Sequence, residues 1–323
     1  MRLPGPTEDF SGVRWIAEHI PFYRVIYGAE GIDPRIIASY DGFSRLPILR
    51  KGLLRSVNPD LLHPPGAIHD ITFESSGTTG RPLVTKYTLE DYMRSIRRLA
   101  ALRGREDFQG KKVLMLLRRG HSAEFGTRKG FELLEAERID LAPSFKPEEV
   151  LREIEEHRYN VLVGIPENPK FPGTSLLDLL EADKKGVVGS HVELAICVGG
   201  ELREEARAQM AAVGLDVISS YGSTETAGIA TEKRGCMRQH VYSDSLVEVL
   251  RDGKSAGLGE RGRVVVSTLA RRGSTTYVRL LTGDSAVYHP PPCRCGEGMA
   301  TLEGVRREEE QDLYLESGCR VMV

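Results

Sequence analysis

The sequence predicts an α/β fold in which a large body around a parallel sheet is followed by a small antiparallel, barrel-like subdomain. Two patterns in the 323 residues support this prediction. In the first part of the chain, short apolar runs alternate with helical stretches, which is typical of βαβ units. The runs lie at 112–117, 161–165, 192–198 and 215–218, and the helical stretches at 89–102, 129–136, 147–157, 175–184 and 204–213.

The second pattern begins after about residue 240, where strand-like runs are separated by turn residues such as Asp252-Gly253. Turns of this kind favour antiparallel pairing. The runs lie at 246–250, 263–269, 276–281 and 285–288. We therefore expect an α/β body over 1–240, which starts with proline-broken helical segments, and a β-rich subdomain over 241–323.

Composition limits the function classes. Hydrophobic residues make up 40% of the chain, charged residues make up 28%, and the formal net charge is -2. Such a chain lacks the electrostatic footprint of a nucleic-acid-binding protein. No stretch approaches the ~20 apolar residues that span a bilayer, and the N-terminus lacks the apolar segment of a signal peptide. We expect a soluble cytoplasmic protein with neither nucleic acid nor membrane as a partner.

A loop rich in glycine and hydroxyl groups follows the strand-like run that ends near residue 74. Glycine lets the backbone approach a phosphate closely, and N–H and O–H donors can surround its oxygens. The loop is not the Walker pattern, because Gly-Lys-Ser/Thr is missing, and its composition alone fits a loop without a ligand equally well. The candidate phosphate-binding residues are Ser75, Ser76, Gly77, Thr78, Thr79, Gly80 and Arg81.

A second polar segment, 220–226, follows the run at 215–218, and ligands of open α/β sheets bind at the carboxyl ends of strands. Tyr221 can stack on a base, and Thr224 can donate a hydrogen bond to a phosphate. Glu225 can hold Mg²⁺, which prefers carboxylate and phosphate oxygens. The alternative is a turn followed by a helix whose N-terminus is capped by Ser223 or Thr224, and this alternative leaves Tyr221-Gly222 unexplained.

In their order along the chain, these segments resemble the signatures of the acyl- and aryl-CoA synthetase superfamily, whose members form adenylates. Segment 75–82 is similar to its phosphate-binding signature, with Arg81 at the usual lysine position, and 220–226 is similar to its second signature. The resemblance implies that Asp284, in Thr-Gly-Asp, accepts hydrogen bonds from the ribose. It also implies that Gly199, Gly200 and Glu201 lie against adenine.

The resemblance is strongest to phenylacetate–CoA ligases and to the related deazaflavin-adenylating synthetases, and it extends from about residue 16 to residue 318. It implies ATP and Mg²⁺ as cofactors, with CoA as a further candidate. Thr224, Glu225 and Arg81 would act at the phosphates. The implied reaction is the adenylation of an aryl or acyl carboxylic acid. Two alternatives stay open: AMP transfer to a phenol-like hydroxyl, and binding of nucleotide and acid with little turnover.

Four further residues have the spacing of a zinc site. Cys236-x-x-x-His240 and Cys293-x-Cys295 together supply three thiolates and one imidazole, a set that Zn²⁺ binds tetrahedrally. Comparable positions in the resembled ligases imply the same site. Its role would be structural, because four protein ligands leave no open coordination position. The alternative is unrelated reduced thiols in loops, with His240 exposed.

Segment 119–126 resembles by position the lining of the acid pocket, where Phe125 and Gly126 can form an apolar slot and His121 can orient a carboxylate. A structural or exposed His121 fits equally well. In the superfamily, a small C-terminal domain with a catalytic lysine follows the region matching 302–306. The 17 residues after Arg306 are too few for that domain, so we expect it to be absent or supplied by a separate polypeptide. Arg306 or Arg307 can still reach the ribose.

Overall fold

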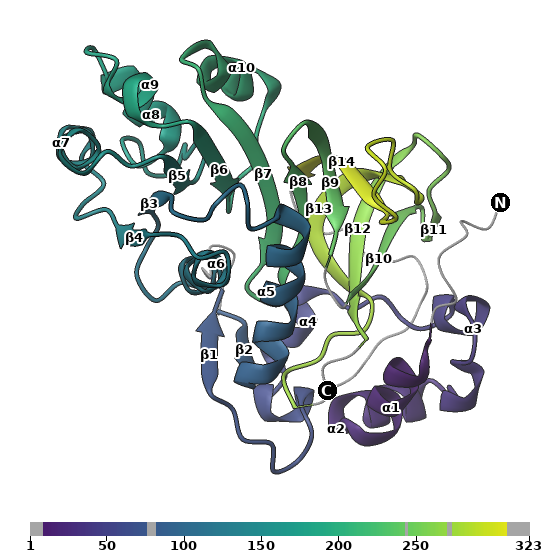
Figure 1. Ribbon diagram of the computed structural model, residues 1–323. Coiled ribbons are helices and arrows are strands. Elements are labelled where there is room, and N and C mark those ends of the chain that lie inside the picture. The colour runs from purple at the N-terminus through teal and green to yellow at the C-terminus, as the bar shows by residue number, and fades with distance from the viewer. Residues whose placement is uncertain (1–8, 76–81, 243–244, 270–272, 309–323) are drawn as a thin grey trace.

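The computed structural model describes residues 9–75, 82–242, 245–269 and 273–308 (Figure 1). Twelve strands form one sheet in the order β11-β10-β12-β13-β14-β9-β8-β7-β6-β5-β3-β4, and β1 and β2 form a separate hairpin. The five strands from β4 to β7 are parallel, and the remaining seven pair antiparallel. The predicted fold class is confirmed. The boundary at residue 240 stays a prediction, because both parts share this sheet.

The parallel part is apolar on both faces because helices cover both. Leu114, Leu162 and Cys197 pack against α7 to α10, whereas Met115 and Ile196 on the other face pack with Phe131 of α6. The strands are β3 (Lys112–Leu116), β4 (Arg138–Leu141), β5 (Val161–Gly164), β6 (Leu194–Val198) and β7 (Asp216–Ser223). The helices are α5 (Leu89–Arg103), α6 (Ser122–Leu133), α7 (Pro147–His157), α8 (Leu176–Ala182), α9 (Val187–His191) and α10 (Glu204–Ala212).

The antiparallel part begins where β7 turns back into β8, and Ile229, Val264 and Leu302 are among the residues of its core. Its strands are β8 (Ala227–Lys233), β9 (Cys236–Val241), β10 (Ser245–Arg251), β11 (Lys254–Ser255), β12 (Arg261–Thr268), β13 (Leu280–His289) and β14 (Thr301–Arg307). The hairpin of β1 (Ile71–Glu74) and β2 (Val84–Tyr87) stands apart from the large sheet.

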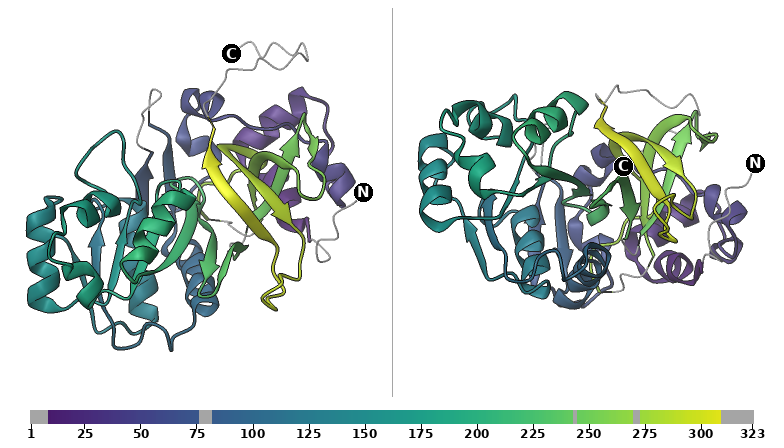
Figure 2. Two further views of the ribbon diagram at one scale, coloured as in Figure 1. Left: turned by 90° about the horizontal axis from the view of Figure 1, so that it is seen from above. Right: turned by 45° about the horizontal axis from the view of Figure 1, so that its top comes forward.

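The N-terminal helices pack beside the antiparallel strands (Figure 2). Their apolar side chains form one core with Tyr277, Val278 and Leu280, so the N-terminal helices are held against the start of β13 and the segment before it. These elements are α1 (Ser11–His19), α2 (Pro21–Ala29), η1 (Pro34–Ile36), α3 (Tyr40–Ser44), α4 (Lys51–Ser56) and η2 (Pro59–Leu62). None of the helices described combines the length and apolar character needed to cross a membrane.

Several elements differ from the sequence prediction. Helix α6 begins at Ser122, seven residues before the expected 129, because His121 caps it by accepting a hydrogen bond from the Ala123 N–H. The two runs expected at 276–281 and 285–288 are replaced by the single strand β13. Strands β8 and β9, which hold the charged and polar sequences Thr-Glu-Lys and Met-Arg-Gln, were not predicted.

Candidate functional site

The carboxyl ends of β6 and β7 bring two of the predicted segments together. Val198 pairs with Ser220 across these strands, so Gly199-Gly200-Glu201 starts beside Tyr221. Gly199 has φ +72°, which favours glycine. A Cβ on Gly200 would lie 3.0 Å from the Ile165 side chain and 3.3 Å from that of Pro166. Glycine at position 200 therefore leaves room for the Ile165 and Pro166 side chains of the neighbouring segment.

Tyr221 and Asp284 meet across the two parts of the sheet. The Tyr221 hydroxyl donates to Asp284 Oδ2 at 2.8 Å, and Arg307 Nη1 lies 3.3 Å from Asp284 Oδ1. Burial, together with the neighbouring Asp284 charge, raises the pKa of Tyr221 well above its ordinary value, so the tyrosine stays a neutral donor. Of the two arginines proposed for the ribose, Arg307 contacts Asp284. Arg306 pairs with Ser285 one position earlier on β14.

Thr224 and Glu225 lie in the turn between β7 and β8. The segment 221–223 is strand and no helix follows it, so the alternative of a capped helix is wrong. The Tyr87 hydroxyl lies 2.8 Å from the Thr224 carbonyl oxygen and 2.9 Å from that of Glu225. This contact fixes the turn against the β1–β2 hairpin.

The Glu225 side chain is 2% exposed and lies 2.9 Å from Nζ of Lys51, which is 9% exposed. Burial favours the neutral acid, but the charge and hydrogen bond of Lys51 outweigh it, and the pKa of Glu225 lies below its ordinary value. Lys51 is the first residue of α4, where the helix dipole disfavours a cation. Its position is therefore accounted for by the carboxylate rather than by the helix.

The structure describes only part of the predicted phosphate-binding loop. Residues Ser76, Gly77, Thr78, Thr79, Gly80 and Arg81 lie outside the described residues. Ser75 is described, and its hydroxyl accepts a hydrogen bond from the Leu83 N–H at 2.8 Å. The same two residues are joined by the Ser75 N–H and the Leu83 carbonyl at 3.0 Å. The ends of this loop are thereby closed by the hairpin.

The predicted acid-pocket segment forms the start of α6. Ser122 Oγ lies 3.5 Å from Thr224 Oγ1, and Phe125 packs with Phe73 and Tyr92. A Cβ on Gly126 would lie 2.8 Å from the Tyr92 hydroxyl, so glycine leaves room for that side chain. His121 is exposed and caps α6. An apolar aromatic cluster therefore begins directly beside the Thr224–Glu225 turn.

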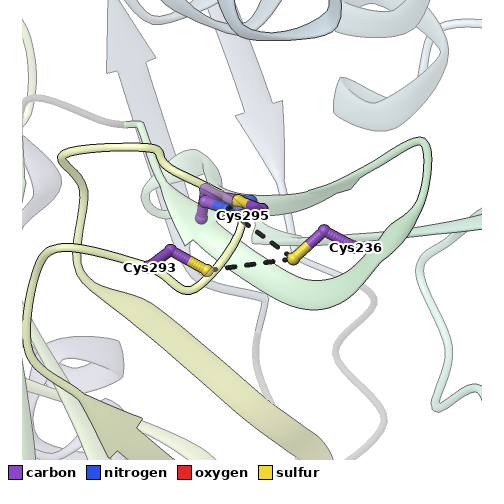
Figure 3. A group of neighbouring side chains, drawn as sticks. Cys236, Cys293 and Cys295 are labelled. Atoms are coloured by element: carbon purple, nitrogen blue, oxygen red, sulfur yellow. Dashed lines mark hydrogen bonds between the residues drawn. The ribbon is translucent and has the colours of Figure 1, made fainter.

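The four predicted zinc ligands converge, although they come from two segments distant in sequence. Figure 3 shows the three cysteines of this group. Their ligand atoms all lie within 4.8 Å of one another. Cys236 Sγ is 3.8 Å from Cys293 Sγ and 3.9 Å from His240 Nε2, which is 3.1 Å from Cys295 Sγ. Two thiolates on a tetrahedral zinc are about 3.8 Å apart, given Zn–S bonds of about 2.3 Å. The donor set and its spacing fit Zn²⁺, and His240 is buried rather than exposed.

Lys51, Tyr87 and Tyr92 were not among the predicted site residues. None of the three lies in a recognisable motif, and they reach the site from elements far from 220–226 in the sequence. A single sequence contains no signal for such long-range contacts.

Known proteins resemble this chain over most of its length. The chain is 28% identical over 316 residues to the phenylacetate–coenzyme A ligase of Aromatoleum evansii, a match that covers 90% of this chain and 67% of that protein. The corresponding enzyme of Thermus thermophilus is 26% identical over 303 residues, with 88% and 65% covered. The chain thus spans about two thirds of the length of these relatives.

Solved structures share the fold. A 2-hydroxyisobutyryl-CoA ligase in complex with its acyl-adenylate superposes with a TM-score of 0.75 at 18% identity, over 91% of this chain and 66% of that one. The O-succinylbenzoate coenzyme A synthetase of Bacillus subtilis, solved with ATP and magnesium, has a TM-score of 0.54 at 17% identity, with 72% and 49% covered. The profile of the AMP-binding enzyme family matches residues 71–267, and the chain belongs to this family of adenylate-forming enzymes.

Proposed function

We propose that the protein binds ATP with Mg²⁺ and an organic carboxylic acid, and transfers AMP to the acid. Family membership supports adenylate formation, and the observation that carries the proposal is the arrangement around the end of β7. Tyr221, near the end of β7, contacts Asp284, and Gly199-Gly200 follows the neighbouring strand β6. The Thr224–Glu225 turn comes directly after β7.

Asp284 would accept hydrogen bonds from the ribose hydroxyls. Tyr221 and Arg307 support this role because they hold both oxygens of the Asp284 carboxylate. The exposed Gly199-Gly200 backbone would receive adenine, as the resemblance to the family implies. Thr224 would donate to a phosphate oxygen, and Ser75 to Arg81 would add further donors, as expected from the sequence.

Glu225 would hold Mg²⁺. Its carboxylate is buried, and its lowered pKa favours the ionised state that a hard cation requires. The Lys51 ammonium lies beside this carboxylate, which shows that the carboxylate stabilises a positive charge at this position. Magnesium would neutralise charge on the phosphates. The side chains of this chain would position the reactants and stabilise developing charge, which are the main contributions to such a transfer.

In the proposed reaction, a carboxylate oxygen of the acid attacks the α-phosphorus of ATP. The new bond is an oxygen–phosphorus bond, the bond from the α-phosphorus to the bridging oxygen breaks, and pyrophosphate leaves with that electron pair. The aromatic cluster of Phe73, Tyr92 and Phe125 would bind the apolar part of the acid. Thioester formation with CoA would be a second step, as the names of the relatives suggest.

Exchange of labelled pyrophosphate into ATP tests the proposal, across a panel of aryl and acyl acids, with and without CoA. We expect Mg²⁺-dependent exchange that requires one class of acid. Exchange that needs no acid but requires a phenolic acceptor would favour AMP transfer to a hydroxyl instead. ATP binding without exchange under any of these conditions would overturn the proposed reaction.

We also propose that Cys236, His240, Cys293 and Cys295 hold one structural Zn²⁺. The spacing of their ligand atoms supports this assignment. The metal would join the β8–β9 hairpin to the segment between β13 and β14 and would supply no chemistry to the reaction, since four protein ligands complete its coordination.

A further inference from the structure

Arg103 is a buried arginine without an acidic partner. It is the last residue of α5 and is 6% exposed. Its Nη2 donates to Ser220 Oγ at 2.6 Å and lies 3.4 Å from Thr231 Oγ1, whereas its buried Nε has no partner. Within the part of the chain that the structure describes, no carboxylate forms an ion pair with it. Arg279, which is equally buried, pairs with Glu248.

A lone buried cation is costly unless something compensates for it. Burial lowers the pKa of Arg103 to about 10, so the guanidinium remains charged at neutral pH. Two hydroxyl groups orient it but provide no negative charge. The end of α5 provides a partial one, because helix C-termini favour cations. A full counter-charge would have to come from a ligand.

The position of Arg103 indicates which ligand this is. Ser220 and Thr231 pair across β7 and β8, and their side chains face α5, whereas the neighbouring Tyr221 reaches Asp284 on the other face. The proposed nucleotide and the Arg103 guanidinium therefore lie on opposite faces of β7. The face toward α5 and α6 also holds the aromatic cluster proposed for the acid.

This face also contains Tyr242, which packs with Leu99 and Leu102 of α5. A Cβ on Gly228 would lie 1.7 Å from the Tyr242 hydroxyl, so glycine is required there. Ser220 is four residues before Thr224, which limits their separation to roughly 13 Å along an extended strand. An acid whose reacting carboxylate lies at Thr224 would have to extend up to about this distance to contact Arg103.

We propose that Arg103 selects the acid: its guanidinium binds a second anionic group at the far end of the substrate, so dicarboxylic acids are preferred over monocarboxylic acids. This inference rests on the proposed function, since it assigns the substrate class of the same site. A charge-assisted contact to the far carboxylate would complete the ion pair that the protein lacks.

The test compares acids that differ only in the far carboxylate: adipate with hexanoate, suberate with octanoate, and para-carboxyphenylacetate with phenylacetate. KM for pyrophosphate exchange is measured for the wild type, Arg103→Met and Arg103→Lys. Arg97→Met, on an exposed position of α5, is the matched control. We expect Arg103→Met to raise KM for the preferred diacid about 30-fold or more while leaving KM for its monoacid unchanged, because a buried charge pair is lost. Arg103→Lys should keep part of the preference.

If Arg103 has only a structural role, the variants should behave differently. If Arg103 only holds β7, β8 and α5 together, Arg103→Met lowers the melting temperature and impairs diacids and monoacids equally, and this outcome overturns the proposal. A wild type without preference for any diacid also overturns it. Isothermal titration calorimetry with the same acids measures their binding without turnover. It therefore separates the proposed adenylation reaction from the proposed recognition of a diacid by Arg103. Arg103-dependent binding of a diacid without exchange would contradict the adenylation reaction but support this inference.

Discussion

Glu225 and Lys51 are a buried pair in which the carboxylate is stabilised in its charged form. If Glu225 holds Mg²⁺, Glu225→Gln should reduce magnesium-dependent pyrophosphate exchange by about 100-fold or more, because a neutral amide is a poor ligand for a hard cation. Circular dichroism should show an intact fold, since the amide oxygen can still accept from Lys51. The exposed Glu205→Gln is the control for the same chemical change. Exchange at the wild-type rate in Glu225→Gln would contradict the assignment.

Removal of Lys51 should have a pH-dependent effect on stability. In the wild type, the folded pKa of Glu225 is lowered, so its contribution is present above the unfolded pKa of about 4.3 and is lost as the pH falls through the folded value. In Lys51→Met, burial is the largest influence on Glu225 and is opposed only by its backbone and Ser223 hydrogen bonds. We expect the folded pKa to rise, so the variant gains relative stability as the pH falls. We expect a loss of about 3 kcal/mol at pH 7.5 that shrinks toward pH 5. Urea unfolding at the two pH values measures it, and an equal loss at both would show that the pair is not responsible.

At the scale of elements, the proposed zinc site would join the β8–β9 hairpin to the segment between β13 and β14, beside the ion pair of Lys233 with Glu297. Metal analysis of protein purified without added zinc should give close to one equivalent per chain. Cys295→Ser should lower the zinc content and reduce the melting temperature by more than about 5 °C, because a structural metal contributes directly to folding. Cys319→Ser, which changes a cysteine outside the proposed set, should keep the zinc. Metal-free wild-type protein, or a Cys295→Ser variant of unchanged stability and zinc content, would rule out the site.

The elements also show what could be predicted from the sequence. Helix α7 was predicted at its observed bounds because Pro147 starts it, two glutamates follow in its first turn and its apolar face is regular. Strands β3, β5 and β6 were predicted because burial on both faces leaves continuous apolar runs. Strands β8 and β9 were missed because their polar side chains, such as Glu232 and Gln239, are buried by partners distant in sequence.

The same limit applies to the candidate site. Motifs indicated Tyr221, Glu225 and Asp284 because their neighbours in sequence resemble family signatures. Lys51 and Arg103 reach the site through tertiary packing, and nothing local distinguishes them from surface cations. Their roles become apparent only when burial and the identity of their partners are known.

At the scale of the whole molecule, Arg279 connects the N-terminal helices to the antiparallel strands. Its guanidinium pairs with Glu248, with Nε 3.1 Å from Oε2, and Nη1 donates to the carbonyl oxygens of Ser44 and Leu46. Both side chains of the pair are less than 5% exposed. Burial raises the pKa of Glu248, and Arg279 partly opposes this effect. The pair therefore couples the first and last parts of the chain, which share one apolar core.

Arg279→Met should lower the free energy of unfolding by about 3–5 kcal/mol, because it leaves Glu248 buried without a counter-charge and two carbonyl groups without a donor. The double variant Arg279→Met/Glu248→Gln should recover part of this loss, since it removes the isolated charge but not the unpaired carbonyls. Urea unfolding of the wild type and of the single and double variants forms a cycle that measures the coupling. If the two single losses simply add in the double variant, the pair is not coupled, and the N-terminal helices are held by the apolar core alone. Coupling of the expected sign would instead mean that a charge pair helps to fix these helices on the antiparallel strands, which also hold Asp284 and Arg307, the residues proposed to bind the ribose.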